Sequence, residues 1–351
     1  HIAEMLLQMS GLVVFVLFFS VGTTAACFSF IGRHHELRKA PFALANNQVA
    51  SFSPVTYNTH GPDWLSAASN SIEASESTNQ VLPPPPRLIV LLPAYNELNR
   101  IGETLEYYHS FLSSSKEWKE ISEILVVDDG SDDGTVEFVN MWTRMNDTVA
   151  VDCISLPQNS GKGAAISFGI DHLVECCGNE PCLVLIADAD GSGDIACLNN
   201  FTKSLANLIA TSKPDTTSFW DTSALVNGYR GYRGSSQFRS ILRWGFRTTA
   251  RVLVGDLRVC DSQCGFKLMT LDAARQLYTN LNLNAWSHDV EVLYRAREWN
   301  LPITEESVPW QDKAGSKLVE SSSGTIQASA VMFMDVLKMR IQYGLGRWKL
   351  P

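Results

Sequence analysis

The stretch Cys182-Leu-Val-Leu-Ile-Ala-Asp-Ala-Asp-Gly-Ser-Gly-Asp194 joins an apolar run to a group of carboxylates. Residues 183–187 are all apolar, which predicts a buried strand of a parallel sheet. Asp188 and Asp190 follow, and because side chains alternate along an extended chain, both carboxylates can point toward one hard cation such as Mg²⁺ or Mn²⁺. The alternative is a strand-end turn in which both side chains only accept hydrogen bonds from the backbone.

The chain before this stretch repeats the same pattern of strand, polar loop and helix. Apolar strands are predicted at 88–92, 124–127 and 149–155, and helices at 97–112, from 135 and at 164–175. Such alternation is typical of a parallel α/β sheet, whose ligands bind at the carboxyl ends of the strands. The predicted fold class is therefore α/β, with the carboxylates at the ligand-binding edge.

Two loops in this region partly match nucleotide-binding patterns. Ser160-Gly-Lys-Gly163 is not a Walker loop, because Leu156 stands where its first glycine is required and a glycine follows the lysine. Residues 191–196 fit the loose dinucleotide pattern, but that role would leave two carboxylates beside a pyrophosphate without a cation. We favour a metal-bridged phosphate ligand, with an NAD-dependent oxidoreductase as an alternative.

Composition narrows the class of protein further. The 351 residues carry a formal net charge of −9 at pH 7, which argues against general nucleic-acid binding, and the 45% apolar content is enough for a folded core. The eight cysteines lie mostly in apolar runs without paired C-x-x-C spacing. This arrangement indicates reduced thiols in a cytosol-facing domain rather than a zinc site.

Residues 1–32 are predicted to be a transmembrane signal anchor. Residues 5–31 contain no charged side chain and are long enough to cross a hydrocarbon core of ~30 Å as a helix. Basic residues follow, so the positive-inside bias places the rest of the chain in the cytosol. A cleaved signal peptide is the alternative, because small residues follow the apolar block. Residues 33–86 are predicted to be a basic flank and a flexible Ser/Pro-rich tether.

Seven short stretches resemble family 2 glycosyltransferases, which have the GT-A fold. Four lie at predicted strand ends, namely Pro93-Ala-Tyr-Asn-Glu97, Val127-Asp-Asp-Gly-Ser131, Asn159-Ser-Gly-Lys-Gly163 and Asp188-Ala-Asp190. Three more are similar to the dolichyl-phosphate β-glucosyltransferase branch, namely Asp261-Ser-Gln-Cys-Gly-Phe-Lys267, Trp286-Ser-His-Asp-Val-Glu291 and Gly315-Ser-Lys-Leu318. Asn227-Gly-Tyr-Arg230 departs from the pattern of that branch. The resemblance implies a catalytic domain at 87–324 and an amphipathic membrane-associated helix at 325–351.

The resemblance implies a donor site for UDP-glucose. The residues expected to bind the nucleotide sugar are Pro93, Tyr95, Glu97, Asp128, Asp129, Lys162 and Asp188. Asp190, together with Asp188, is expected to hold Mg²⁺ or Mn²⁺, which would neutralise charge on the UDP leaving group; a third ligand is left open. Asp129 as a helix cap and Lys162 as a solvated loop residue are the alternatives.

The implied acceptor, dolichyl phosphate, needs cationic partners more than a strong base. Its second pKa near ~6 leaves the phosphate anionic at pH 7. Asp289, expected to be catalytic together with Asp188 and Asp190, would position the acceptor or act as a residual base. The residues expected around the acceptor phosphate are Arg230, Arg233, Arg243, Arg247, Asp261, Gln263 and Lys267.

Two segments have the pattern of helices that lie in a membrane interface. Arg239, Arg243, Arg247 and Arg251 recur every four residues among apolar side chains and form a basic stripe on a predicted helix. Residues 331–348 form a second such segment, interrupted too often by charges to span a bilayer. A plain amphipathic surface helix is the alternative for the stripe.

The activity implied by the resemblance is inverting transfer of glucose from UDP-glucose to dolichyl phosphate, for protein N-glycosylation. The enzyme is expected at the endoplasmic reticulum membrane as a single-pass protein with its catalytic domain in the cytosol, with the bilayer as a partner. One alternative is a dolichyl- or polyprenyl-phosphate mannosyltransferase or another polyprenyl-phosphate glycosyltransferase. Another is a non-catalytic nucleotide-sugar-binding regulator. The oligomeric state is left open.

Overall fold

The computed structural model describes residues 83–212, 219–230, 248, 251, 253–311, 313 and 322–350, and only the backbone of 322–330. These residues belong to the second of two compact units, Ser77–Pro351. The predicted anchor at 1–32 and nearly all of the predicted tether lie outside them. Within these ranges, no helix combines the length and the apolar character needed to cross a bilayer.

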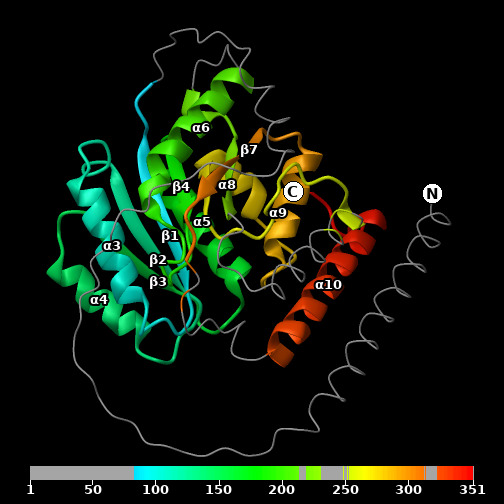
Figure 1. The fold of residues 1–351 in the computed structure, drawn as a ribbon, viewed down its shortest axis with the longest axis horizontal. Coiled ribbons are helices and arrows are strands. Elements are labelled where there is room, and N and C mark those ends of the chain that lie inside the picture. Colours follow the sequence, from blue (N-terminus) through cyan, green and yellow to red (C-terminus); the bar gives the residue numbers. More distant parts are fainter. Residues whose placement is uncertain are drawn as a thin grey trace, which may run out of the picture. The chain divides into compact units, whose positions relative to one another are not determined.

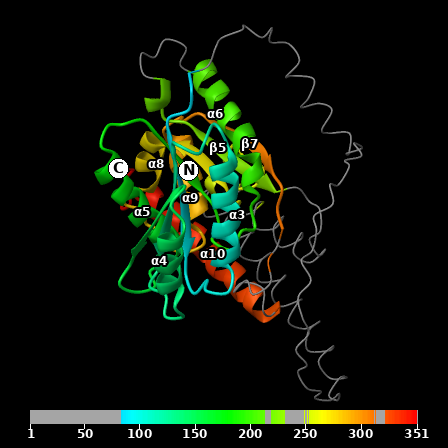
Figure 2. The same cartoon turned by 90° about the vertical axis from the view of Figure 1, so that its left-hand side faces the viewer.

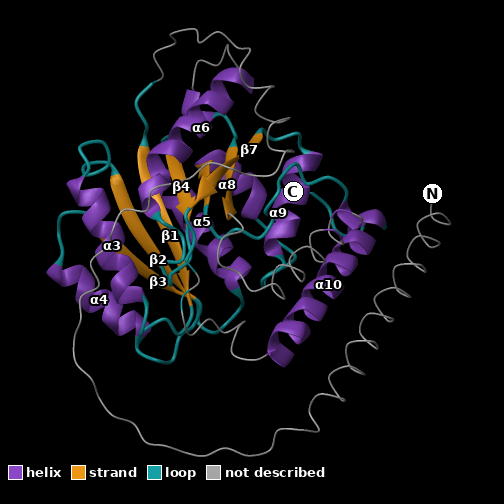
Figure 3. Ribbon diagram, viewed as in Figure 1, coloured by secondary structure: helices purple, strands orange, loops and turns teal. Residues whose placement is uncertain are grey.

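A seven-stranded sheet forms the centre of the domain (Figures 1 and 3). Its order is β3-β2-β1-β4-β6-β5-β7, and among these strands β6 alone runs antiparallel to its neighbours. The predicted mostly parallel α/β sheet is therefore confirmed. The strands are β1 (Arg87–Ala94), β2 (Ser122–Asp128), β3 (Ala150–Ser155), β4 (Cys182–Ile186), β5 (Leu225–Arg230), β6 (Lys267–Thr270) and β7 (Ile303–Val308).

Helices cover both faces of the sheet (Figure 2). One face packs against α3 (Ile101–Ser114), α4 (Thr135–Met145) and α6 (Leu198–Ser212). The other packs against α5 (Lys162–Cys177), α8 (Leu271–Tyr278), α9 (His288–Glu298) and α10 (Ser322–Gly344). The 3₁₀ turns η2 (Ile195–Cys197) and η3 (Phe219–Asp221) lie at either end of α6 in the sequence.

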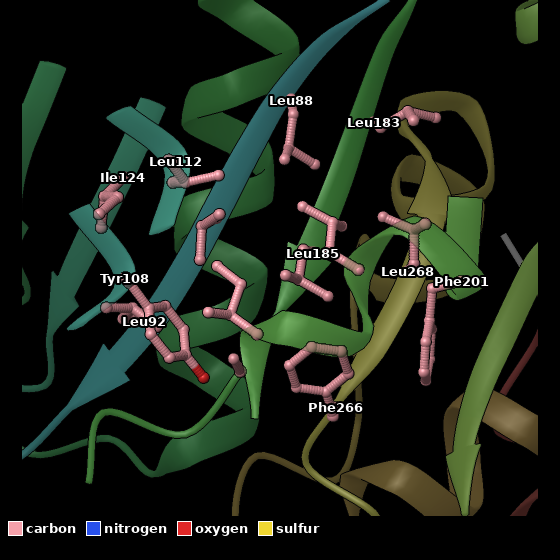
Figure 4. Packing of buried hydrophobic residues seen from close by; sticks show 14 of the residues in the cluster. Leu88, Leu92, Tyr108, Leu112, Ile124, Leu183, Leu185, Phe201, Phe266 and Leu268 are labelled. Carbon is pink, nitrogen blue, oxygen red and sulfur yellow. The ribbon is translucent and has the colours of Figure 1, made fainter. Parts of the chain in front are cut away.

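Alternation along the strands divides the apolar side chains between two cores. Leu183 and Leu185 of β4 belong to the core under α3 and α6 (Figure 4), whereas Val184 and Ile186 belong to the core under α5 and α9. All four side chains are almost completely buried, and burial of each contributes about 1.5–3 kcal/mol. The strand that leads into Asp188 is therefore firmly held on both faces.

The first helix begins later than predicted, at Ile101 instead of residue 97. The intervening backbone is held by side chains of the loop after β2 and of the first residue of α4. The Glu97 amide donates to Thr135 Oγ1 at 2.9 Å, and the Leu98 amide donates to Asp133 Oδ2 at 3.1 Å. Asn96 also adopts a left-handed conformation, with φ of 53°. This loop-to-loop pairing delays the helix and fixes the end of β1.

The C-terminal helix α10 is anchored on α9, the helix that carries Asp289. Tyr343 donates from its hydroxyl to the buried Glu291 at 2.8 Å, and Ser287 Oγ donates to Asp335 Oδ2 at 2.9 Å. The exposed side of α10 carries apolar residues, with Met334 59% exposed. A helix is therefore present in the segment predicted to be amphipathic, while its amphipathic character and its membrane contact stay predictions.

Candidate active site

The loops that carry the predicted donor residues meet at one edge of the sheet. β1 lies between β2 and β4, and all three run parallel, so their carboxyl ends are adjacent. Ala94 pairs with Asp128, and the Ala187 amide donates to Leu91 O at 3.1 Å. Pro93 and Tyr95, at the end of β1, are half-buried.

Asp128 and Asp129 have different environments although they are consecutive. Asp129 accepts hydrogen bonds from the amides of Ser160 at 2.7 Å and Gly161 at 2.8 Å, and so fixes the glycine loop. Burial raises the pKa of Asp129 above its ordinary value despite these two bonds. Asp128 Oδ2 accepts from local amides, whereas its buried Oδ1 has no hydrogen-bond partner in the described structure. Asp128 is thus the better placed of the two to accept a bond from a ligand.

Glu97 and Asp190 are linked by Arg100, which the sequence analysis did not single out. Arg100 donates to both carboxylate oxygens of Glu97, at 2.7 and 2.6 Å, and its Nη1 lies 3.5 Å from Asp190 Oδ2. Asp190 Oδ1 accepts from the amide and hydroxyl of Ser192, at 2.9 and 2.6 Å. Arg100 therefore connects the end of β1 with the loop after β4.

Asp188 forms an ion pair with Lys162, the first residue of α5. Burial opposes the charge of Lys162, but Asp188, Asp289 and Asp190 outweigh it and hold the pKa of the ammonium above its ordinary value. A Cβ at position 265 would lie 2.5 Å from Asp188 Oδ2, so only glycine fits beside this carboxylate. The lysine and the first carboxylate, each assigned to the donor, are thus brought into contact.

Arg230 and Asp261, assigned to the acceptor, form a bidentate pair at the end of β5. The Nε–Oδ2 and Nη2–Oδ1 distances are 2.7 and 2.9 Å, and the guanidinium lies 5.0 Å from the centre of the Trp310 ring. Burial disfavours the Asp261 carboxylate, yet pairing with Arg230 holds the pKa of Asp261 below its ordinary value. Asp261 therefore orients Arg230.

Lys267 and Asp289 form a second pair, buried more deeply. Lys267 Nζ lies 2.7 Å from Asp289 Oδ1 and also donates to Cys264 O, and the lysine side chain is only 1% exposed. His288 Nε2 is 3.4 Å from the same carboxylate oxygen. The charge of Lys267 is therefore matched inside the protein, and direct contact with an acceptor phosphate stays a prediction.

The pKa of Asp289 lies below its ordinary value. Burial alone would raise it, but the nearby imidazole of His288 and the ammonium groups of Lys267 and Lys162 outweigh burial. Burial lowers the pKa of His288 below its usual value. Asp289 is thus a weak base at neutral pH, which suits a positioning role better than proton abstraction.

Of the other residues assigned to the acceptor, three lie outside the described residues and Gln263 lies beside Asp261, to which its backbone amide donates at 3.4 Å. Arg233, Arg243 and Arg247 lie outside, as does most of the basic stripe, and Arg251 is exposed. Gln263 reaches toward α10, with its side-chain nitrogen 4.0 Å from Met332 Sδ. The structure therefore brings together the donor residues more completely than the acceptor residues.

Known proteins resemble this chain in sequence over most of its length. The model of glycosyl transferase family 2 matches residues 89–208. A dolichyl-phosphate β-glucosyltransferase of Dictyostelium discoideum is 31% identical over 86% of this chain and 91% of its own length. A protein of the same name from Homo sapiens is 33% identical over 76% of this chain and 79% of its own length. This chain belongs to the dolichyl-phosphate β-glucosyltransferase family.

Among solved structures, the mannosyltransferase PcManGT from Pyrobaculum calidifontis, in complex with GDP-Man and Mn²⁺, has a TM-score of 0.47 and 16% identity, covering 82% of this chain and 72% of that one.

The carboxylates at the end of β4 suit a cation that is shared with a substrate. Asp188 and Asp190 supply hard oxygen donors, and Mg²⁺ or Mn²⁺ commonly uses one or two carboxylates plus substrate phosphates. No group of three His, Cys, Asp or Glu side chains that could hold a metal occurs in the described part of the chain. Asp188 and Asp190 would therefore hold the cation together with a diphosphate, where it would offset leaving-group charge.

The sequence analysis gave no role to Arg100 and His288, which contact site residues, or to Glu291, which lies on the same helix as Asp289. Arg100 stands within a turn before a helix, where an arginine is ordinarily a solvated residue. Glu291 is fully buried and accepts hydrogen bonds from the amides of Asn282 and Leu283, at 3.1 and 2.7 Å. The sequence feature that could have pointed to Glu291 is its position at the end of the Trp286–Glu291 stretch, which resembles the dolichyl-phosphate β-glucosyltransferase family.

Proposed function

We propose that this protein transfers glucose from UDP-glucose to dolichyl phosphate, giving dolichyl β-D-glucosyl phosphate and UDP. The similarity to curated dolichyl-phosphate β-glucosyltransferases over most of the chain carries this conclusion. The adjacent carboxylates at the ends of β1, β2 and β4 supply a donor site of suitable chemistry. The reaction is an inverting glycosyl transfer in which the acceptor phosphate oxygen forms the new bond to the anomeric carbon and UDP leaves.

The donor is held by residues from three strand ends. Asp128, with its unpartnered Oδ1, is available to accept a bond from the uracil or ribose of UDP. Asp129 acts indirectly, because its carboxylate is already bonded to the Ser160 and Gly161 amides. Lys162 and the N-terminus of α5 provide positive potential for the diphosphate. Asp188 and Asp190 hold the divalent cation, Mg²⁺ or Mn²⁺.

The acceptor supplies its own nucleophile. A phosphate monoester with a second pKa near ~6 is dianionic over most of the neutral range, so no side chain has to remove a proton. Arg230, oriented by Asp261, can neutralise this phosphate. Asp289 shapes the pocket through its contacts with Lys267 and His288.

The membrane is the source of the acceptor, and we assign three segments to it. Residues 1–32 anchor the chain, the basic stripe that includes Arg243 and Arg247 meets lipid phosphates, and α10 lies in the interface with Val331 and Met334 toward lipid. Ser287, which precedes α9, donates a hydrogen bond to Asp335 of α10. The helix that we assign to the membrane is therefore attached to the helix that carries Asp289. We place the enzyme at the endoplasmic reticulum with its catalytic domain in the cytosol.

This orientation predicts that two glycosylation sequons, at Asn146 and Asn200, carry no glycan. Asn200 lies exposed on α6 and would be reachable in the lumen, whereas Asn146 ends α4 with its side chain bonded to Trp142 O at 3.0 Å. Treatment of the native protein with a glycosidase is expected to leave its mass unchanged. Glycan at Asn200 would contradict the cytosolic orientation.

The function is tested by incubating the full-length protein in detergent with radiolabelled UDP-glucose and dolichyl phosphate. Label is expected in an organic-soluble product that mild acid cleaves to free glucose. Product formation should require dolichyl phosphate and stop in excess chelator. Tight UDP-glucose binding without labelled lipid would favour the non-catalytic regulator.

A further inference from the structure

The ion pair between Lys162 and Asp188 occupies the place assigned to the divalent cation. Both side chains are mostly buried, at 15% and 23% exposure, and the ammonium contacts Asp188 Oδ1 directly. On the other side, Arg100 Nη1 lies 3.5 Å from Asp190 Oδ2. Each of the two proposed metal ligands therefore already faces a positive charge from the protein.

The backbone around Lys162 is fixed, whereas its side chain is long and has several rotatable bonds. The preceding Gly161 has φ of 101° and is bonded through its amide to Asp129, and the Ala164 amide donates to Asn284 O at 3.1 Å. The lysine stem has four carbons, so a fixed Cα lets the ammonium reach several positions. The Trp286 ring, whose centre is 5.7 Å from Nζ, is 45% exposed to solvent.

Electrostatics set the order in which ligands can enter. A divalent cation at Asp188 would meet the Lys162 ammonium at a few ångströms, where repulsion in a half-buried site is strong. A diphosphate beside the N-terminus of α5 offers the ammonium a second anionic partner of higher charge. Lys162 can then leave Asp188 without losing its counter-charge.

We propose that Lys162 is an exchangeable counter-ion. It neutralises Asp188 in the free protein, moves to the diphosphate when a nucleoside diphosphate binds, and so opens Asp188 to the divalent cation. The inference rests on the proposed function only in requiring a nucleoside diphosphate donor. Metal and nucleotide then bind with positive coupling, and the metal alone binds weakly.

Lys162→Met tests this inference because it removes the charge while keeping the length of the side chain. Titration of full-length protein in detergent with Mn²⁺ alone, followed by the electron paramagnetic resonance of free Mn²⁺, is expected to show at least tenfold tighter binding in the variant. UDP binding at saturating Mn²⁺ is expected to weaken by at least tenfold. A purely structural lysine, or one that only binds phosphate, would not tighten Mn²⁺ binding.

Two controls accompany the variant. Lys162→Arg keeps the charge and should bind Mn²⁺ alone about as weakly as wild type, and Lys203→Met removes an exposed lysine of α6 and should change neither affinity. Mn²⁺ affinity that is unchanged or weaker in Lys162→Met would overturn the inference. The Mn²⁺ titration needs no sugar transfer, so it stands apart from the wild-type assay of glucose transfer that tests the proposed function.

A second measurement decides the matter if Lys162→Met does not fold. A crystal structure of the wild-type protein with Mn²⁺ and UDP should place Lys162 Nζ on a phosphate oxygen, beyond hydrogen-bond distance of Asp188. An ammonium that stays on Asp188 in that complex would equally overturn the inference.

Discussion

Replacing Asp190 with asparagine is expected to lower kcat/KM for glucose transfer by about 10³-fold, equivalent to ~4 kcal/mol of transition-state stabilisation, while the protein stays folded. The asparagine can still accept the bonds from Ser192, whose amide and hydroxyl lie 2.9 and 2.6 Å from Asp190 Oδ1. What is lost is one of the two negative charges proposed to hold the cation. The measurement is steady-state kinetics of the purified variant across a range of Mn²⁺ and Mg²⁺ concentrations.

Asp194→Asn is the matched control for Asp190→Asn. Asp194 lies in the same loop, but its carboxylate accepts from the Tyr107 hydroxyl at 2.6 Å and caps the turn at Ile195. Its replacement should leave activity within a few-fold of wild type. Near-normal turnover of Asp190→Asn, or full wild-type activity in excess chelator, would remove Asp190 as a metal ligand.

The second large effect is expected from Asp289→Asn, which leaves the Lys267 ammonium buried without its counter-charge. Breaking a buried ion pair on one side costs about 3–5 kcal/mol. The pKa of Asp289 is lower in the folded protein than in the unfolded chain, where it is about 3.9. The ion pair therefore stabilises the fold fully at pH values above about 3.9, and this stabilisation is lost as the pH falls through the folded-state pKa. Urea unfolding at pH 7 measures the cost.

Glu298→Gln is the control for this loss of stability. Glu298 pairs with Arg297 at 2.5 Å near the surface, with side chains 34% and 25% exposed, so its loss should cost less than about 1 kcal/mol. Equal losses of unfolding free energy in Asp289→Asn and Glu298→Gln would show that leaving Lys267 buried without its counter-charge costs no more than losing a surface ion pair.

Asp289→Asn also separates the roles of protein and lipid in catalysis. Since the lowered pKa keeps Asp289 ionised through the neutral range, the fall of kcat/KM for dolichyl phosphate below about pH 6 should follow the acceptor's second ionisation. The variant should be slower through misplacement of the acceptor, with its acid limb unmoved. A limb that vanishes or moves by more than about one pH unit in the variant would make Asp289 the base.

The parts of the site that lie along single strands could be predicted from sequence. The apolar run at 183–187 predicted that Asp188 and Asp190 follow a buried strand, and the strand-loop-helix repeat predicted that they lie at the same edge of the sheet as the loops after β1 and β2. These features depend on local periodicity, which the structure confirms for the sheet. Strand β4 ends at Ile186, so the two carboxylates lie in the loop and turn that follow, and not on extended chain as alternation would require. The late start of α3 was missed because it depends on hydrogen bonds that the side chains of Asp133 and Thr135, which follow β2, accept from the amides of residues 98 and 97.

The pairings across the site could not be predicted. Lys162 and Asp188, Arg100 and Asp190, and Lys267 and Asp289 come from separate elements, and each charge could equally have faced solvent or ligand. Burial decides between these possibilities, and burial depends on how helices pack on the sheet. Lys267 in particular is expected near an acceptor phosphate, and the sequence did not indicate that it also contacts Asp289 and Cys264 O.

Donor competition tests the central claim most directly. Full-length protein is given UDP-glucose and GDP-mannose in separate assays and together, with dolichyl phosphate and Mg²⁺, and kcat/KM is measured for each sugar in the lipid product. Glucose is expected to be transferred at least 10²-fold more efficiently than mannose, with a β-linked product. Preferred transfer of mannose, or no lipid-linked sugar from a folded protein with either donor, would contradict the account.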